Sequence, residues 1–156
     1  MYIKSCPVCG EKPLTQILKL GKIPLVNYFP VLEELSNKIK KYPLNLCFCQ
    51  RCSLMQLDYV ISPRSLFQTY HYLTSASNSL IDHFNEFASE CVHRHFLKTE
   101  DKVLDIGAND GTLLFHFQKR GIKTLGVDPS HNAVAFAQKR GIEVIPAFFG
   151  EKTAKG

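Results

Sequence analysis

Apolar residues recur at helical spacing over one long stretch, from Ser77 to about Leu97. Positions three and four residues apart share one face of a helix, so this spacing predicts a single amphipathic helix. Ser77 or Asn78 is expected to cap its first turn, because short polar side chains accept hydrogen bonds from the free amides there. The apolar positions are Leu80, Ile81, Phe84, Phe87, Ala88, Cys91, Val92 and Phe96.

Between residues 102 and 149, short apolar runs alternate with segments of helical periodicity. A glycine follows each predicted helix, where helices commonly end. The order strand–helix–strand–helix–strand with short connections predicts a parallel sheet with right-handed crossovers. The expected elements are a buried strand at Lys102–Ile106, a tight loop at Gly107–Gly111, a helix at Thr112–Arg120, a strand at Lys123–Val127, a helix at His131–Arg140 and a strand at Ile142–Ile145.

The first 60 residues have a different character, with short apolar runs interrupted by prolines. Each proline fixes φ and removes a backbone donor, which argues against long helices. Short strands and turns are therefore expected, with one helical turn near Leu32–Ser36. The prolines are Pro7, Pro13, Pro24, Pro30 and Pro43.

Composition places the chain among ordinary globular proteins, with 45% hydrophobic and 21% charged residues in a length of 156. We expect a cytoplasmic location, because the sequence shows no apolar run of about 18 residues and no secretory h-region near Met1. The net charge of +5 is dispersed, and its densest cluster, at residues 38–41, is short. Neither a nucleic-acid partner nor a membrane is therefore expected.

The cysteines form the first constellation with chemical meaning. In a reducing compartment, six cysteines favour metal binding or free thiols over disulfides. Two C-x2-C pairs, each followed by a glycine or a small residue, are typical half-sites of a tetrahedral zinc site. The predicted zinc ligands are Cys6, Cys9, Cys49 and Cys52.

Four thiolates would fill every position of that site, so we interpret the zinc as structural and not catalytic. Cys47 is a rival ligand, but the alternation along Leu46–Phe48 favours packing in a strand. Cys91 falls on the apolar face of the long helix and is expected to be buried. The alternative is that all these cysteines are unligated residues of a reduced core.

A second constellation follows the predicted strand Lys102–Ile106. Gly107 and Gly111 allow backbone to approach a ligand, and the helix from Thr112 would offer its free amides to a carboxylate. Asp128, at the end of the next strand, can accept both hydroxyls of a ribose. The dinucleotide pattern G-x-G-x-x-G fails here, because its later glycines are replaced by Asn109 and Thr112.

Asp105 instead suits an ammonium group, which favours S-adenosylmethionine (SAM) as the ligand. The predicted cofactor-binding residues are Asp105, Gly107, Asn109, Gly111 and Asp128. The alternative is a strand–turn–helix whose glycines have only a structural role.

Four strings, in order along the chain, resemble a family of SAM-dependent sugar C-methyltransferases. Leu20–Phe29 reads L-G-K-I-P-L-V-N-Y-F and is similar to the family's L-G-x-x-P-L-A-N-x-F. Cys49–Leu57 resembles its C-x-x-C-G-L-V-Q-L, with Ser53 in place of the glycine. Tyr70–Ser77, followed by His83, resembles its Y-x-Y-x-S-S-x-S…H segment. Ile106–Leu114 reads I-G-A-N-D-G-T-L-L, close to its I-G-S-N-D-G-T-L-L.

The resemblance implies methyl transfer from SAM to a carbon next to a ketone on a nucleotide-linked keto-deoxysugar. Tyr70 and Tyr72 are the candidate catalytic residues, because a tyrosine hydroxyl can polarise a keto oxygen. The family's general base is expected in its later half, beyond Gly156, so the chain reads as a truncated N-terminal portion. The remaining alternatives are a methyltransferase for another small acceptor, and a non-catalytic zinc-ribbon binding module with a vestigial nucleotide-binding fold.

The expected fold class is α/β, with a small zinc-binding module followed by the first half of a Rossmann-like class I methyltransferase domain. We divide the chain into a zinc-binding module at residues 1–62, a helical connector covering the cofactor site at residues 63–100, and a partial SAM-binding domain at residues 101–156. Residues 103–106 would leave an apolar sheet edge unpaired, which predicts poor solubility or dimerisation through that edge.

Overall fold

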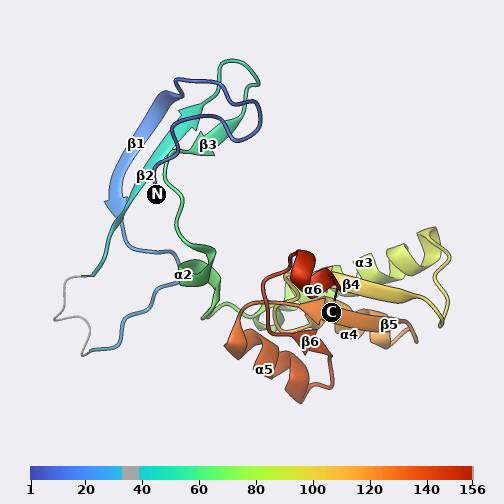
Figure 1. Cartoon of the computed structure of the whole chain (residues 1–156). Coiled ribbons are helices and arrows are strands. Elements are labelled where there is room, and N and C mark those ends of the chain that lie inside the picture. Colours follow the sequence, from blue (N-terminus) through green and yellow to red (C-terminus); the bar gives the residue numbers. More distant parts are fainter. Residues whose placement is uncertain (33–38, 156) are drawn as a thin grey trace. The chain divides into compact units, whose positions relative to one another are not determined.

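A computed structural model describes residues 1–32 and 39–155, which form two compact units, Met1–Leu66 and Phe67–Gly156. We call them the N-terminal and the C-terminal unit, and describe each by itself (Figure 1). The helical turn expected at Leu32–Ser36 falls mostly on residues 33–38, outside the described residues. The predicted division at residues 62 and 100 stays a prediction.

The N-terminal unit is built on an antiparallel sheet of strands β1 (Thr15–Ile23), β2 (Tyr42–Phe48) and β3 (Met55–Leu57), in the order β1-β2-β3 (Figure 1). The short helix α2 (Pro63–Phe67) lies at its C-terminal boundary. As the prolines predicted, the described part of this unit contains no long helix.

The N-terminal unit has a core made largely of cysteine. Among its described residues, the buried side chains are Cys6, Cys47, Cys49 and Asn45. The β1 side chains are mostly exposed, including Leu20 at 56%. Three thiols and an amide bury little apolar area, so the hydrophobic effect alone supplies little folding energy here.

The C-terminal unit contains a parallel sheet of β4 (Lys102–Ile106), β5 (Lys123–Val127) and β6 (Val144–Ile145), in the order β4-β5-β6. Helices α4 (Thr112–Gln118) and α5 (His131–Lys139) connect these strands, and α6 (Glu151–Lys155) follows them. The predicted α/β class, with a Rossmann-like parallel sheet behind a cysteine-rich module, is confirmed. The third strand is shorter than predicted.

Helix α3 (Asn78–Arg94) confirms the long amphipathic helix, after the short 3-10 helix η1 (Thr74–Ala76). It packs through the fully buried Ala88 against Phe117 of α4. Two of the apolar positions at helical spacing are exposed: Phe87 is 43% exposed and Phe96 is 80% exposed. Phe96 lies beyond the helix end with a φ of 52°, so the helical period no longer sets its direction.

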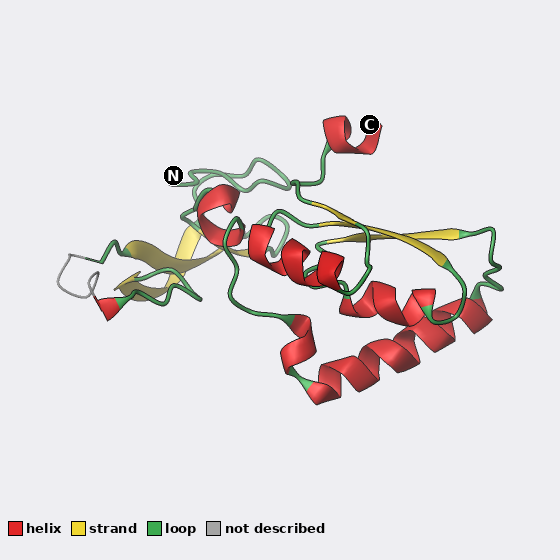
Figure 2. Cartoon of the chain, turned by 90° about the horizontal axis from the view of Figure 1, so that it is seen from below, coloured by secondary structure: helices red, strands yellow, loops and turns green. Residues whose placement is uncertain are grey.

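The predicted burial of β4 is also wrong, because only one of its faces is covered. Val103 packs against both apolar clusters of the unit, whereas Leu104 is 48% and Ile106 is 56% exposed. Successive side chains of a strand point to opposite faces, and helices α3, α4 and α5 all lie on one side of this sheet (Figure 2). In the described residues β4 pairs only with β5, so it is an edge strand. Dimerisation through this edge stays a prediction.

Burial of His116 in α4 gives a first prediction. The side chain is 5% exposed, and neither ring nitrogen has a hydrogen-bond partner among the described residues. Burial lowers the pKa of His116, and the positive charges of Arg120, Lys119 and Arg140 lower it further against the opposing charge of Asp82.

A histidine with a lowered pKa takes up its proton more readily when the chain is unfolded. The contribution of neutral His116 to stability is therefore present above the ordinary histidine pKa of about 6.5 and is lost as the pH falls below it. We expect the urea midpoint of the C-terminal unit to fall between about pH 7 and pH 5, and His116→Leu to flatten that fall. The exposed His93, changed to glutamine, serves as control; an equal flattening there would contradict the assignment.

No helix among the described residues is both long enough and apolar enough to cross a membrane.

Candidate functional site

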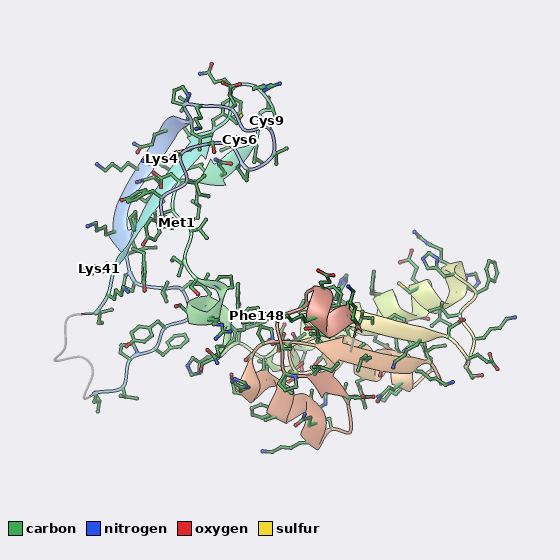
Figure 3. The ribbon with its side chains drawn as sticks, in the orientation of Figure 1. Met1, Lys4, Cys6, Cys9, Lys41 and Phe148 are labelled. Atoms are coloured by element: carbon green, nitrogen blue, oxygen red, sulfur yellow. The ribbon has the colours of Figure 1, made fainter. Side chains whose placement is uncertain are left out.

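Two sites emerge, one in each unit. In the N-terminal unit the structure brings together the four predicted cysteines, whose Sγ atoms all lie within 4.8 Å of one another. Cys6 Sγ lies 3.5 Å from Cys52 Sγ, and Cys9 Sγ lies 3.5 Å from Cys49 Sγ. Figure 3 labels Cys6 and Cys9 among the loops at one end of the antiparallel sheet. Cys47 is buried in β2, outside the cluster, as predicted.

Each C-x2-C pair sits on a similar turn. The amide of Gly10 donates to the carbonyl of Cys6 at 2.9 Å, and the amide of Ser53 donates to that of Cys49 at 2.8 Å. Gly10 and Ser53 both have left-handed backbones, with φ of 76° and 60°. Ser53 thus has a backbone conformation that glycine adopts more freely. This explains why the family pattern has glycine at this position.

The electrostatics of the cluster call for a cation. The backbone N–H of Cys9 lowers the pKa of the Cys6 thiol to about 7. The N–H of Leu54 also lowers the pKa of the Cys52 thiol, but burial and the neighbouring thiols outweigh this effect and raise that pKa to about 12. Four thiolates repel one another unless a metal neutralises them. Their spacing fits zinc, because sulfurs at Zn–S distances of about 2.3 Å lie about 3.8 Å apart in a tetrahedron.

In the C-terminal unit, two loops meet at the carboxyl edge of the parallel sheet, where open α/β sheets bind ligands. One loop is Gly107–Gly111 after β4, and the other is Asp128–Ser130 after β5. The Asp128 carboxylate joins them: Oδ2 accepts from the amide of Asn109 at 2.8 Å, and Oδ1 accepts from the amide of Ser130 at 2.8 Å. Each oxygen keeps a second lone pair, so a ribose hydroxyl can still donate to it.

Asp105 lies one residue before the end of β4 and is partly exposed. Burial raises the pKa of its carboxyl, and the charge of Asp128 raises it further. None of the ion pairs among residues 1–32 and 39–155 involves either carboxylate. Two neighbouring carboxylates without a cationic partner favour a cationic ligand.

The two loop glycines have different surroundings. A Cβ on Gly107 would meet nothing within 4 Å, so this position leaves space for a ligand. A Cβ on Gly111 would lie 2.8 Å from Cγ2 of Ile142, so this glycine allows the helix to pack closely. Sequence reasoning named both as ligand-binding residues and missed the packing requirement at Gly111.

The expectation of free amides at the start of α4 is wrong at its first residue. The amide of Thr112 donates to Oδ1 of Asp110 at 3.2 Å, and its hydroxyl donates to the same oxygen at 2.7 Å. Asp110 is fully buried, and hydrogen bonds from Ser75 and Thr112 outweigh its burial and lower its pKa. This carboxylate therefore occupies the amide of Thr112, one of those that were predicted to face a ligand carboxylate.

The tyrosine segment Tyr70–Ser75 lies against the Gly107–Gly111 loop. The amide of Ser75 donates to Asp110 at 2.9 Å, and the amide of Thr74 donates to Oδ1 of Asn109 at 3.0 Å. The rings of Tyr70 and Tyr72 pack edge to face, with centroids 6.5 Å apart. The structure thus brings the candidate catalytic tyrosines to the same edge of the sheet as the predicted cofactor-binding residues.

Sequence reasoning missed one residue of this arrangement, Asn132. Its side chain binds both backbone polar groups of Tyr70, 62 residues away in the sequence. The only local signal was a polar residue in the first turn of a helix, after the cap Ser130.

Comparisons with known proteins find similarity in both units. Residues 6–67 match the family described as "Putative zinc binding domain", and residues 88–151 match the family "Methionine biosynthesis protein MetW". Fold and site thus define a zinc-binding module in front of a Rossmann-like domain. The chain is 36% identical over 147 residues to the C-methyltransferase NovU of Streptomyces niveus. These similarities support a relation to zinc-binding methyltransferases.

The similarity to NovU covers 94% of this chain and 35% of that protein, so the chain spans about a third of this relative's length. A solved structure, the plantazolicin methyltransferase BpumL in complex with SAH, has a TM-score of 0.34 and 23% identity to the chain. That likeness covers 46% of this chain and 30% of BpumL.

Proposed function

We propose that this chain binds SAM in its C-terminal unit and is the N-terminal portion of a C-methyltransferase that acts on a nucleotide-linked keto-deoxysugar. The observation that carries the cofactor assignment is the pair of neighbouring carboxylates, Asp105 and Asp128, which has no cationic partner among the described residues. The similarity to NovU along nearly the whole chain supports the reaction class. The sugar substrate rests on the four motif resemblances described above.

Three residues of the proposed SAM site have a chemical role toward the ligand. Asp105 holds the ammonium of the amino-acid moiety, and Asp128 accepts the ribose hydroxyls through its remaining lone pairs. Gly107 leaves the space in which the ligand passes the backbone. When bound, SAM supplies an electrophilic methyl group on a sulfonium.

Tyr70 and Tyr72 are proposed to contact the acceptor near its keto oxygen. A phenol that donates a hydrogen bond stabilises the negative charge that develops on that oxygen when the neighbouring carbon loses its proton. The resemblance implies that the base that removes the proton belongs to the later half of the family's chain.

We propose that the four clustered cysteines hold a structural zinc ion. With four sulfur ligands the tetrahedral coordination is complete, so the ion offers no open position to a substrate. The metal therefore contributes to folding and takes no part in the methyl transfer.

Calorimetric titration of the chain with SAM tests the cofactor assignment. We expect one-to-one binding that weakens as the pH falls through the raised pKa of Asp105, because SAM, a cation, binds the ionised carboxylate. Asp105→Asn should weaken binding about tenfold to a hundredfold at neutral pH, the equivalent of losing a hydrogen bond to a charged group, and should remove the pH dependence.

The same variant should stabilise the free protein. A carboxyl with a raised pKa is less easily ionised in the folded state, so Asp105 opposes folding above that pKa. A more stable free protein combined with weaker SAM binding would identify Asp105 as a binding residue. Glu100→Gln, at an exposed acid before β4, is the matched control and should leave both quantities unchanged. Absence of SAM binding at neutral pH would overturn the proposal.

A further inference from the structure

Two short hydrogen-bond chains connect the carboxylate of Asp128 to the backbone of the tyrosine segment. Through Oδ2, Asp128 holds the amide of Asn109, whose Nδ2 donates to the carbonyl of Tyr72 at 3.0 Å and whose Oδ1 accepts from the amide of Thr74 at 3.0 Å. Each oxygen of one carboxylate starts one chain. The second chain runs through residues after β5.

That second chain passes through Ser130 and Asn132. Asp128 Oδ1 accepts from the amide of Ser130, and the Ser130 hydroxyl donates to Oδ1 of Asn132 at 2.8 Å. Asn132 then binds Tyr70 twice: the amide of Tyr70 donates to Oδ1 at 3.1 Å, and Nδ2 donates to the carbonyl of Tyr70 at 2.6 Å. The side-chain amide of Asn132 thus satisfies both backbone polar groups of Tyr70, as a neighbouring strand would do.

These contacts use backbone atoms of the tyrosine segment, which leaves the phenol groups of Tyr70 and Tyr72 available for a ligand. They also come from an element that is itself fixed: Ser130 caps α5 by accepting from the amide of Ala133, and Ala133 is fully buried. The two hydrogen bonds between Asn132 and Tyr70, which we call the tether, therefore start from a fixed helix at the carboxyl edge of the sheet.

We infer that Asn132 is a positioning residue, which holds Tyr70 at the ligand-binding edge and couples occupancy of the Asp128 loop to the order of the tyrosine segment. Asn109 performs the same task for Tyr72 and Thr74. A ligand that hydrogen-bonds to Asp128 restrains the loop from which both chains start, so it orders the segment that faces the acceptor. The inference rests on the proposed function only for the choice of ligand.

Amide hydrogen exchange of the free protein tests the tether without any ligand. In Asn132→Ala, exchange at the Tyr70 amide should accelerate about tenfold or more, because that amide loses its acceptor, while amides of β5 keep their rates. Asn132→Asp retains the acceptor for that amide and should accelerate its exchange less. Gln138→Ala, at an exposed position on the same helix, should change neither rate. Unchanged exchange at Tyr70, or uniform acceleration that includes β5, would overturn the inference.

Addition of S-adenosylhomocysteine (SAH) then tests the coupling. In the wild-type chain, saturating SAH should slow exchange at the amides of Tyr70 and Thr74. In Asn132→Ala, Tyr70 should lose this response while Thr74, held by Asn109, keeps it. An SAH response at Tyr70 that survives in the variant would overturn the coupling. If SAH does not bind at all, the proposed function fails, but the exchange rates of the free protein still decide whether the tether exists.

Discussion

Removal of the metal should unfold the N-terminal unit and leave the parallel sheet of the C-terminal unit folded. The described part of Met1–Leu66 buries three cysteines and one asparagine, which is too little apolar area to offset the entropy of ordering the chain. Binding of a structural zinc ion contributes about 10–16 kcal/mol at neutral pH, more than the whole stability of many domains. Chelation, followed by circular dichroism and by metal analysis of the same sample, measures the loss.

A pair of cysteine variants separates metal binding from packing. Cys49→Ser removes a predicted ligand and should abolish both bound zinc and the fold of the unit, whereas Cys47→Ser changes a buried cysteine of β2 that lies outside the cluster. The second change should cost about 1–3 kcal/mol, as expected for burying a hydroxyl without a partner, and should leave one zinc per chain. A folded N-terminal unit in metal-free Cys49→Ser protein would refute the structural role of the metal.

Local sequence patterns were enough to predict the cysteine cluster and the order of strands and helices. A C-x2-C pair forms its turn within five residues, so the half-sites at Cys6–Cys9 and Cys49–Cys52 depend little on the rest of the fold. Helical period and terminal glycines placed α4 and α5 within two residues of their observed ends. Each of these features depends on residues that are close together in the sequence, so it can be predicted from one sequence.

Features that depend on partners distant in sequence were not predicted. The exposure of Leu104 and Ile106 reflects which face of the sheet the helices cover, and an apolar strand pattern does not contain that information. The contacts of Asn132 join residues 62 positions apart through side-chain and backbone groups, without any periodic signal. Asp110 was read as part of a loop motif, but its buried carboxylate in fact organises the start of α4.

Gly111→Ala should destabilise the C-terminal unit by about 2–5 kcal/mol. The backbone of Gly111 has a φ of 72°, where an L-residue costs about 1–2 kcal/mol. The added methyl group would also lie 2.8 Å from Cγ2 of Ile142 and 3.3 Å from Cβ of Ala137. Both neighbours are buried in the main apolar cluster, so overpacking adds about 1–3 kcal/mol. Urea denaturation followed by helical circular dichroism gives the change.

Gly107→Ala isolates the packing contribution, because the two glycines share a left-handed backbone and differ in their surroundings. At Gly107 φ is 84°, but the new methyl group would meet nothing within 4 Å, so the cost should stay at the backbone strain of about 1–2 kcal/mol. The same methyl group projects into the space assigned to SAM, so Gly107→Ala should weaken SAM binding more than it lowers stability. Equal destabilisation by the two variants would show that Ile142 yields to the methyl group. Undiminished SAM binding by Gly107→Ala would show that the ligand does not pass this residue.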